Sequence, residues 1–255
     1  MPIEAATTIA TLNPLWPLGT DPKSQGDDHI RMIKSVLQAS DGGALSRMVQ
    51  TIITTSGTYT KPAGLKFLDV TVVAGGGGGG YCRSGAGQCG VGSGGAAGGT
   101  AQVLLAAADV AATVAMTVGA AGTAGIASTP VAAGNGGNSS FGTQAVAGGG
   151  PAGGSLVASA AYCWQGPQGG IGTTGSLLSR GGPGGHGIII GTAAFQHTPG
   201  HGGNSLLGGG GYGGIHGGGL AGQLGSGGGG AGDTGASNRN GGPGGAGLII
   251  LREYF

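Results

Sequence analysis

Side chains that could do chemistry are scarce in the long central part of this chain. Hydrolases that cut sugars, esters or phosphates need paired carboxylates, a nucleophile with its base, or metal ligands. Between Val70 and Gly232 the only charged residues are Arg83, Asp109 and Arg180. A sugar depolymerase needs two facing carboxylates, and Asp109 supplies one, so the second would have to come from a neighbouring subunit. The sequence therefore predicts a protein that is not an enzyme.

One histidine pair and one glycine run resemble parts of a zinc site and of a nucleotide site, but the other residues that such sites need are missing. His197 and His201 would suit a zinc ion only on a helix, and the intervening Pro199-Gly200 disfavours a helix there. The run Gly75 to Gly80 formally fits a dinucleotide fingerprint. However, no acidic residue follows near position 100 to bind a ribose, and no Gly-Lys-Ser/Thr follows either. We therefore expect no metal, no nucleotide and no other cofactor.

Aromatic and histidine side chains are the natural contact groups between the glycine runs. Tyrosine and tryptophan give a large contact area at a low entropy cost. The segments 162–165 (YCWQ) and 195–198 (FQHT) each gather large side chains, and Arg83 could bind an anionic group. The alternative is that these residues wedge or cap the glycine scaffold. The candidate binding residues are Tyr81, Arg83, Tyr162, Trp164, Arg180, Phe195, His197, Tyr212 and His216.

The cysteine count is odd. Cys82, Cys89 and Cys163 could form one disulfide and leave a free thiol, or all three could be buried thiols. A Cys82–Cys89 disulfide would close a small loop within the glycine-rich part.

The composition favours an ordered, glycine-rich fold. Glycine supplies 68 of 255 residues and proline 11, a level typical of low-complexity chains. Disorder also needs low hydrophobicity and high net charge, whereas this chain is 38% hydrophobic with a formal charge of +1. Ordering so much glycine costs roughly 1–2 kcal/mol per residue, so the backbone must make dense contacts.

Charge and targeting signals exclude several partners. The near-neutral balance provides no basic stripe for nucleic acid, and no run approaches the roughly 20 apolar residues of a membrane span. The first residues, MPIEAATTIATLNPLW, lack a basic stretch typical of a secretory signal. We expect synthesis in a cytoplasm, with no membrane insertion.

The elements that position these residues begin with a helix in an N-terminal region, 1–50. Ser24 or Asp27 is a typical helix start, and Asp41-Gly42-Gly43 is a typical stop. One short amphipathic helix cannot bury its apolar stripe alone, so we expect it to serve attachment or oligomerisation. The candidate contacts are Ile30, Ile33, Val36 and Leu37.

The second region, 51–255, combines strands with glycine runs. Alternating or aliphatic patterns predict strands at 51–55, 59–60, 67–73, 113–118 and 248–255. Runs such as Gly75 to Gly80 favour extended helices with three residues per turn that pack at short distance. We therefore predict a mostly β fold with a polyglycine II-like bundle and a short N-terminal α-helical anchor, whose loops emerge at the ends of the bundle.

Two glycine-rich motifs recur about 60 residues apart. GNGGNSSFG at 134–142 resembles GHGGNSLLG at 200–208, and GGPGGHGIII at 181–190 resembles GGPGGAGLII at 241–250. The repeats suggest two related lobes. Collagen is excluded because glycine does not recur strictly at every third residue.

These patterns together resemble a phage protein family. Residues 19–34 (GTDPKSQGDDHIRMIK) are similar to the N-terminal segment of many tail fibre proteins of tailed phages and prophages. An ordered series resembles their glycine-rich domain, namely residues 59–64, the run 75–80, and residues 117–119, 138–142 and 247–254. Together the two matches cover most of the chain.

The resemblance implies a tail fibre adhesin, similar in role to the tip adhesins of T-even-type phages. It implies a homotrimer in the virion tail that binds a pilus, lipopolysaccharide or outer-membrane protein, and it implies contact with other tail proteins through the N-terminus. The alternatives are a purely structural fibre connector and, less favoured, a polysaccharide depolymerase.

Overall fold

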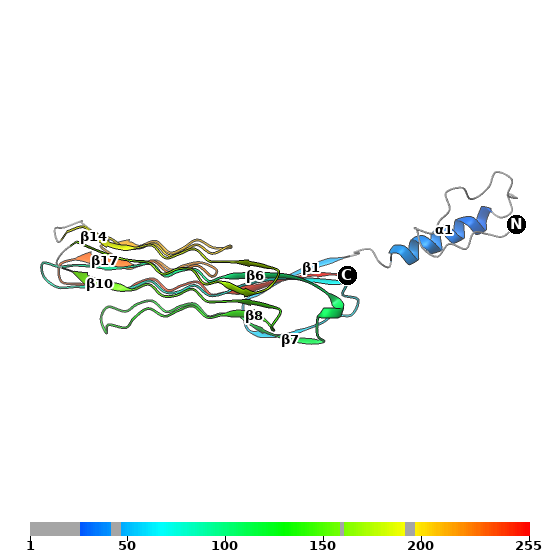
Figure 1. Ribbon diagram of the computed structural model, residues 1–255, viewed down its shortest axis with the longest axis horizontal. Helices are drawn as coiled ribbons and strands as arrows, with labels where there is room; N and C mark the ends of the chain where they lie inside the picture. The colour runs from blue at the N-terminus through cyan, green and yellow to red at the C-terminus, as the bar shows by residue number, and fades with distance from the viewer. Residues whose placement is uncertain (1–25, 42–46, 159–160, 192–196) are drawn as a thin grey trace. The chain divides into compact units, whose positions relative to one another are not determined.

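The computed structural model describes residues 26–41, 47–158, 161–191 and 197–255, which fall into two compact units, Met1–Arg47 and Met48–Phe255. In the first unit α1 spans Gly26–Asp41, which confirms the predicted helix (Figure 1). Val36 is buried, whereas Ile30 and Ile33 are exposed, and the side chain of Leu37 lies outside the described part. No helix in the described part of the chain is long and apolar enough to cross a membrane.

The second unit is mostly β, and ten of its strands form a base of two five-stranded sheets. The first sheet has the order β1-β19-β3-β6-β13, with bounds Met48–Ile53, Leu248–Tyr254, Phe67–Val73, Thr100–Ala106 and Leu177–Ser179. The second has the order β12-β9-β8-β7-β2, with bounds Gly172–Thr174, Ala145–Ala147, Ser139–Phe141, Thr113–Thr117 and Gly57–Thr60. The strands predicted from alternating residues are therefore confirmed, with ends shifted by a few residues.

The main hydrophobic core lies between the two sheets of the base. Leu68, Val70 and Val72 alternate along β3 and are fully buried, because every second residue of a strand faces the same side. Phe141 of β8 is also fully buried, and its ring centroid lies 5.5 Å from that of Tyr59. Both the first and the last strand of this unit belong to the base.

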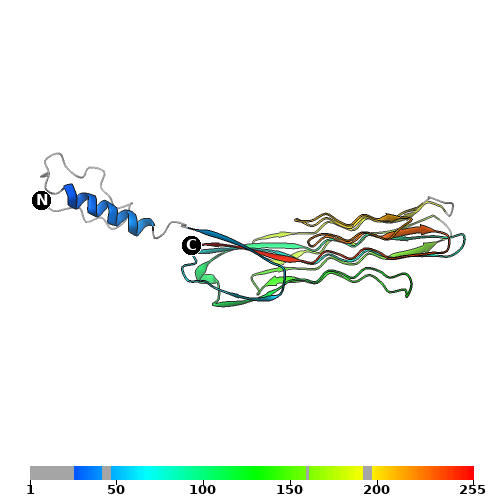
Figure 2. The ribbon, with the colours of Figure 1, turned by 180° about the vertical axis from the view of Figure 1, so that it is seen from behind.

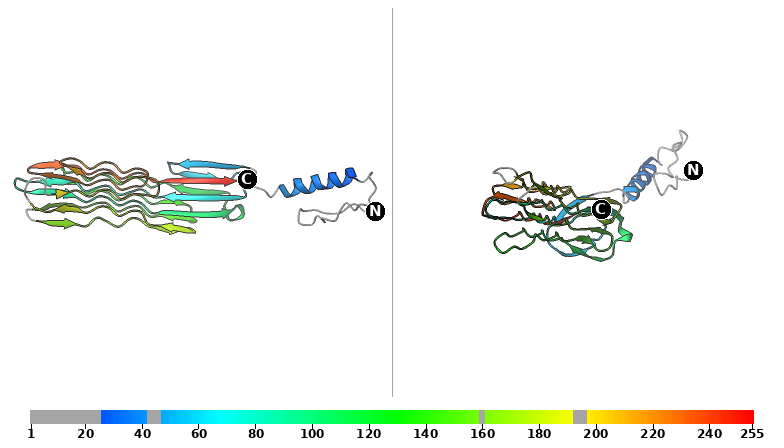
Figure 3. Two further views of the ribbon diagram at one scale, coloured as in Figure 1. Left: turned by 90° about the horizontal axis from the view of Figure 1, so that it is seen from above. Right: turned by 60° about the vertical axis from the view of Figure 1, so that its left-hand side comes forward.

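The other strands form three small sheets, which we call the tip. One has the order β10-β5-β17-β16, with bounds Ser155–Ala158, Cys89–Gly92, Ala231–Thr234 and Gly214–Ile215. The others are β11-β14-β15, with bounds Tyr162–Trp164, Gly187–Ile189 and His197–Thr198, and β18-β4, with bounds Ser237–Arg239 and Cys82–Ser84. Within this unit the base and the tip lie at opposite ends of the glycine runs (Figures 2 and 3).

The glycine runs between base and tip are joined by backbone hydrogen bonds that follow a three-residue period. The central run, Gly75–Gly80, donates its N–H groups in rotation to three neighbouring segments, with N···O distances of 2.8 to 3.0 Å. The successive acceptors are Gly137, Gly245, Ala96, Gly134, Gly242 and Ser93. Its carbonyl groups accept in rotation from three further segments, through Gly150, Gly122, Gly228, Gly153, Gly125 and Ala231. The central run is therefore bonded to six neighbours.

This packing leaves no room for a side chain along the central run. A Cβ at any residue of Gly75–Gly80 would overlap a backbone carbonyl group of a neighbouring segment. Larger residues occur where a position faces away from the neighbours. In the run 181–187, the N–H groups of Gly182 and Gly185 donate to carbonyl groups of a neighbouring run. Pro183 is exposed between them, and it has no backbone N–H group to leave without a partner.

The repeated motifs hold neighbouring runs rather than form two lobes. Asn138 Oδ1 accepts from Gly149 N–H at 2.8 Å, and Asn204 Oδ1 accepts from Gly210 N–H at 2.7 Å. Three residues earlier, Asn135 and His201 accept from Ala152 and Gly213 N–H groups in the same way. The expectation of two lobes is wrong, because Met48–Phe255 forms one compact unit. In both copies of the first motif the same positions therefore accept hydrogen bonds from a neighbouring run.

Candidate functional site at the tip

The tip brings together charged and ring side chains that are far apart in the sequence. Asp233 of β17 lies at the centre and is only 5% exposed. Its carboxylate accepts from Arg239 Nε at 2.7 Å, from His216 Nδ1 at 2.9 Å and from the Thr234 N–H at 2.8 Å. We call Asp233, His216 and Arg239 the tip cluster.

The tip cluster keeps Asp233 ionised. Burial alone would raise the pKa of this carboxyl group. The hydrogen bonds from His216, Arg239 and the Thr234 N–H, with the charge of Arg239, outweigh burial and hold the pKa well below its usual range. The β17–β18 hairpin and the connection that holds His216 are therefore tied to one buried charge. His216 has a positive φ of 53°, a backbone conformation that is uncommon outside glycine.

His197 of β15 packs against the tip cluster and is 3% exposed. Its ring meets that of His216 edge-on, with centroids 5.0 Å apart. His197, predicted as a contact residue, is therefore buried rather than displayed in this structure, since its ring fills space between β15 and Gly232. Burial, together with the neighbouring His216, lowers the pKa of His197 below its usual value.

This lowered pKa makes the tip sensitive to acid. Because folding lowers its pKa, His197 takes up a proton less readily in the folded tip than in the unfolded chain, so stability is lost as the pH falls below the usual value of about 6.5. We expect hydrogen exchange in β15 and β17 to accelerate between pH 7.5 and 5.5, after correction for intrinsic exchange. His197→Gln should reduce this acceleration, whereas His201→Gln on the exposed flank should not. Equal acceleration in wild type and His197→Gln would contradict the assignment.

A polar cleft of about 460 Å³ opens between two hairpins of the tip. Its walls come from the β4–β5 and β17–β18 connections, because β4 pairs with β18 and sets Arg83 opposite Asn238. Ser84 Oγ donates to the Gly235 carbonyl, which ties the two hairpins together. Arg83 is exposed and is the one charged residue among the described residues that line the cleft. The cleft suits an anionic group flanked by hydroxyl and amide partners.

Exposed aromatic side chains lie on a neighbouring tip strand. Tyr162 and Trp164 of β11 are 53% and 40% exposed, and Ile190, just after β14, is 67% exposed. The Trp164 indole lies against Gly154, so this residue both contacts the scaffold and presents part of its ring. Tyr81 is half-buried, and Phe195 lies outside the described residues.

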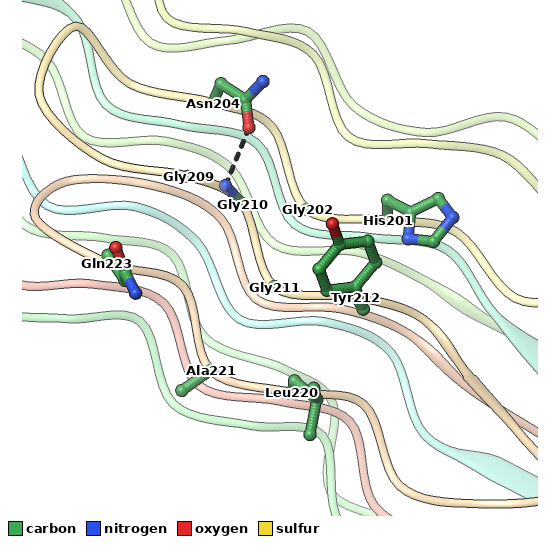
Figure 4. A pocket seen from close by; sticks show the side chains of 10 residues that line it. All are labelled: His201, Gly202, Asn204, Gly209, Gly210, Gly211, Tyr212, Leu220, Ala221 and Gln223. Carbon is green, nitrogen blue, oxygen red and sulfur yellow. Dashed lines mark hydrogen bonds between the residues drawn. The ribbon is translucent and has the colours of Figure 1, made fainter.

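Two candidates are placed away from the tip. The Arg180 guanidinium donates to the Gly169 carbonyl, and its backbone pairs with Ile171 next to the base strand β12. Tyr212 is 69% exposed and meets the His201 ring edge-on, with centroids 5.3 Å apart. These two rings line a groove of about 500 Å³ on the flank of the bundle (Figure 4).

The cysteines do not form the disulfide that their spacing allowed. Cys82 and Cys89 are buried free thiols, and Cys163 is an exposed free thiol. The Cys82 thiol is directed to the Asp233 carbonyl at 3.9 Å, whereas the Cys89 thiol donates to the Gly191 carbonyl at 3.3 Å. The two sulfur atoms therefore serve different partners. Burial raises the pKa of Cys82 to about 11, so this thiol stays protonated.

Sequence reasoning missed Asp233 and Arg239, which tie the tip together. A usable signal was present, because Asp233 is a lone acid directly after a long glycine run and Arg239 closes the next hairpin. Among the described residues, no group of three or more His, Cys, Asp or Glu side chains is arranged to hold a metal ion.

Comparison with known proteins places the chain in a family. A search of curated proteins finds no match. A family model described as a glycine-rich domain matches residues 52–254, which include the base, the glycine runs and the tip. The chain therefore belongs to the glycine-rich domain family.

Proposed function

We propose that this protein is a tail fibre adhesin of a tailed phage and attaches the virion to a receptor on the bacterial surface through its tip. The main support for the proposal is that the core and the displayed side chains lie in different parts of the second unit. The base holds the main core, the glycine runs carry few side chains, and the tip displays Arg83, Tyr162 and Trp164. The resemblance of residues 19–34 to phage tail fibre proteins supports the same role.

The glycine runs in this proposal form a polyglycine II-like bundle. The three-residue hydrogen-bond period and the six neighbours of Gly75–Gly80 support this assignment. Close backbone contacts also favour weak Cα–H···O bonds between runs. Because each hairpin connection emerges at the end of the bundle, its sequence can change without altering the interior. Such an arrangement suits recognition of receptors that differ between hosts, and it binds rather than catalyses.

Attachment to the virion is assigned to the N-terminal unit. Ile30 and Ile33 are 52% and 39% exposed on α1, and a homotrimer would cover them. Several copies per virion would then add weak contacts into strong attachment through avidity. In this arrangement the protein resides in the virion tail.

A purely structural connector is the second candidate, and the outer face of the base favours it. Ile52 and Leu104 are 56% and 62% exposed, and strand register places them on the same face of one sheet as Asp69 and Arg252. Asp69 accepts from Arg252 and from Gln102, each at 2.9 Å. A second copy or another tail protein could cover this face.

Removing the Trp164 side chain separates the two candidates. We expect Trp164→Ala to weaken binding of fluorescently labelled protein to susceptible bacteria by about tenfold or more, since aromatic anchors dominate interfaces. The measurement is a titration by flow cytometry. Leu104→Ala, which removes an exposed apolar side chain of the base, is the control and should bind like wild type.

Two outcomes would contradict the adhesin. Absence of wild-type binding to susceptible cells would favour the connector, as would loss of binding in Leu104→Ala but not in Trp164→Ala. Release of reducing sugar from the host polysaccharide would instead indicate a depolymerase.

A further inference from the structure

The groove on the flank of the bundle has an unusual floor for a protein surface. Its lining includes Gly209, Gly210 and Gly211, so a ligand can approach the backbone without meeting side chains. A Cβ added at Gly209 would meet nothing within 4 Å. The groove therefore combines a smooth glycine floor with rings and amides along its sides (Figure 4).

The two rings of the groove are held in fixed orientations. His201 Nδ1 accepts from the Gly213 N–H at 3.1 Å, so in the neutral imidazole the proton lies on Nε2. Tyr212 packs edge-on against that ring, with an interplanar angle of 89°. Because Tyr212 is 69% exposed, it offers an open ring face and a hydroxyl group.

Hydrogen-bonding groups surround this ring. Asn204 uses Oδ1 to accept from Gly210, which orients its amide and leaves the NH₂ to donate. Gln223 is exposed along the next run. Among the described residues, no partner accepts from the N–H groups of Gly209 and Tyr212, whereas those of Gly210 and Gly211 are bonded. The groove is thus rich in neutral donors.

The chemistry of the lining selects among ligands. None of the described residues that line the groove is Arg, Lys, Asp or Glu, so an anionic ligand would find no countercharge. A further glycine run could not pack there at backbone distance, because the Tyr212 and Leu220 side chains stand in the way. An exposed ring with neutral donors and acceptors fits a polyhydroxylated ring compound.

We propose that this groove binds a neutral oligosaccharide, with one sugar ring stacked on Tyr212 and its hydroxyl groups bonded to His201 Nε2, Asn204 and Gln223. The site goes beyond the proposed attachment through the tip, because it is built from runs on the flank and shares no lining residue with the cleft at Arg83.

An array of neutral and acidic oligosaccharides, probed with the labelled full-length chain, tests the proposal. We expect wild type to bind one or more neutral glycans, with affinities then measured by titration calorimetry. Tyr212→Ala should weaken that binding by about tenfold or more, whereas Tyr212→Phe should retain most of it. Leu104→Ala, which removes an exposed side chain of the base, is the matched control and should bind like wild type. Thermal unfolding should be unchanged in all three variants, because both side chains are exposed.

The outcomes separate this site from attachment through the tip. Absence of binding to every neutral glycan, binding to acidic glycans alone, or equal binding by wild type and Tyr212→Ala would each overturn the groove proposal. Loss of cell binding in Trp164→Ala with unchanged glycan binding would leave both proposals standing. Glycan binding without any attachment to cells would support the groove while refuting the adhesin.

Discussion

Gly78→Ala is expected to prevent the second unit from folding to its native state. The added Cβ would overlap the Thr123 carbonyl group, and the backbone on both sides is fixed. The Gly78 N–H donates to Gly134 at 3.0 Å, and its carbonyl accepts from Gly153 at 2.8 Å. Because no flexible side chain can yield, the free energy of unfolding should fall by more than about 4 kcal/mol. Circular dichroism and urea unfolding of the purified variant measure the effect.

Gly209→Ala is the matched control for this prediction. The two substitutions add the same methyl group to a glycine run, but the Cβ at Gly209 would meet nothing within 4 Å. Stability should therefore change by less than about 0.5 kcal/mol. If Gly78→Ala were as stable as Gly209→Ala, the close packing of the runs would be wrong.

Asp233→Ala has the second largest expected effect, and it acts at the tip. Removal of the carboxylate leaves Arg239 and His216 without their shared partner and should cost about 2–3 kcal/mol of local stability. Hydrogen exchange in β4, β17 and β18 should accelerate by about 30- to 150-fold, while β3 and β19 of the base keep their protection. Exchange followed by mass spectrometry resolves the two ends of the unit.

Asp109→Ala is the control for Asp233→Ala, because it also removes a carboxylate but lies outside the tip cluster. Asp109 is exposed in the short 3₁₀ helix Ala107–Asp109, and its backbone carbonyl rather than its carboxylate accepts from Gln144. Exchange at the tip should match wild type. Unchanged tip exchange in Asp233→Ala would show that the tip cluster does not hold the hairpins.

Side-chain patterns made the base predictable from the sequence. Leu68, Val70 and Val72 alternate with polar residues, which fixed both the strand and its buried face. The helix Gly26–Asp41 was equally readable from its start and stop residues. Lone glycine runs carry no such pattern. The neighbours of Gly75–Gly80 come from six distant segments, and only the folded backbone reveals their order.

The candidate site was predictable only where large side chains interrupt the glycine runs. Trp164 and Arg83 are large side chains between glycine runs, which made them candidates, and both lie at the tip. Their neighbours depend on which hairpins meet, so the burial of His197 and the role of Asp233 could not be read from composition. The Cys82–Cys89 spacing suggested a bond that the strand geometry does not make.

We propose that the tip attaches a phage to its host, and competition for adsorption tests this proposal most directly. Excess purified protein is added to susceptible bacteria before a phage that, under this proposal, carries the chain in its tail, and unadsorbed phage is counted. We expect wild-type protein to slow adsorption and Trp164→Ala, folded and at equal concentration, to do so much less. Adsorption that proceeds at the same rate with and without saturating wild-type protein would contradict it.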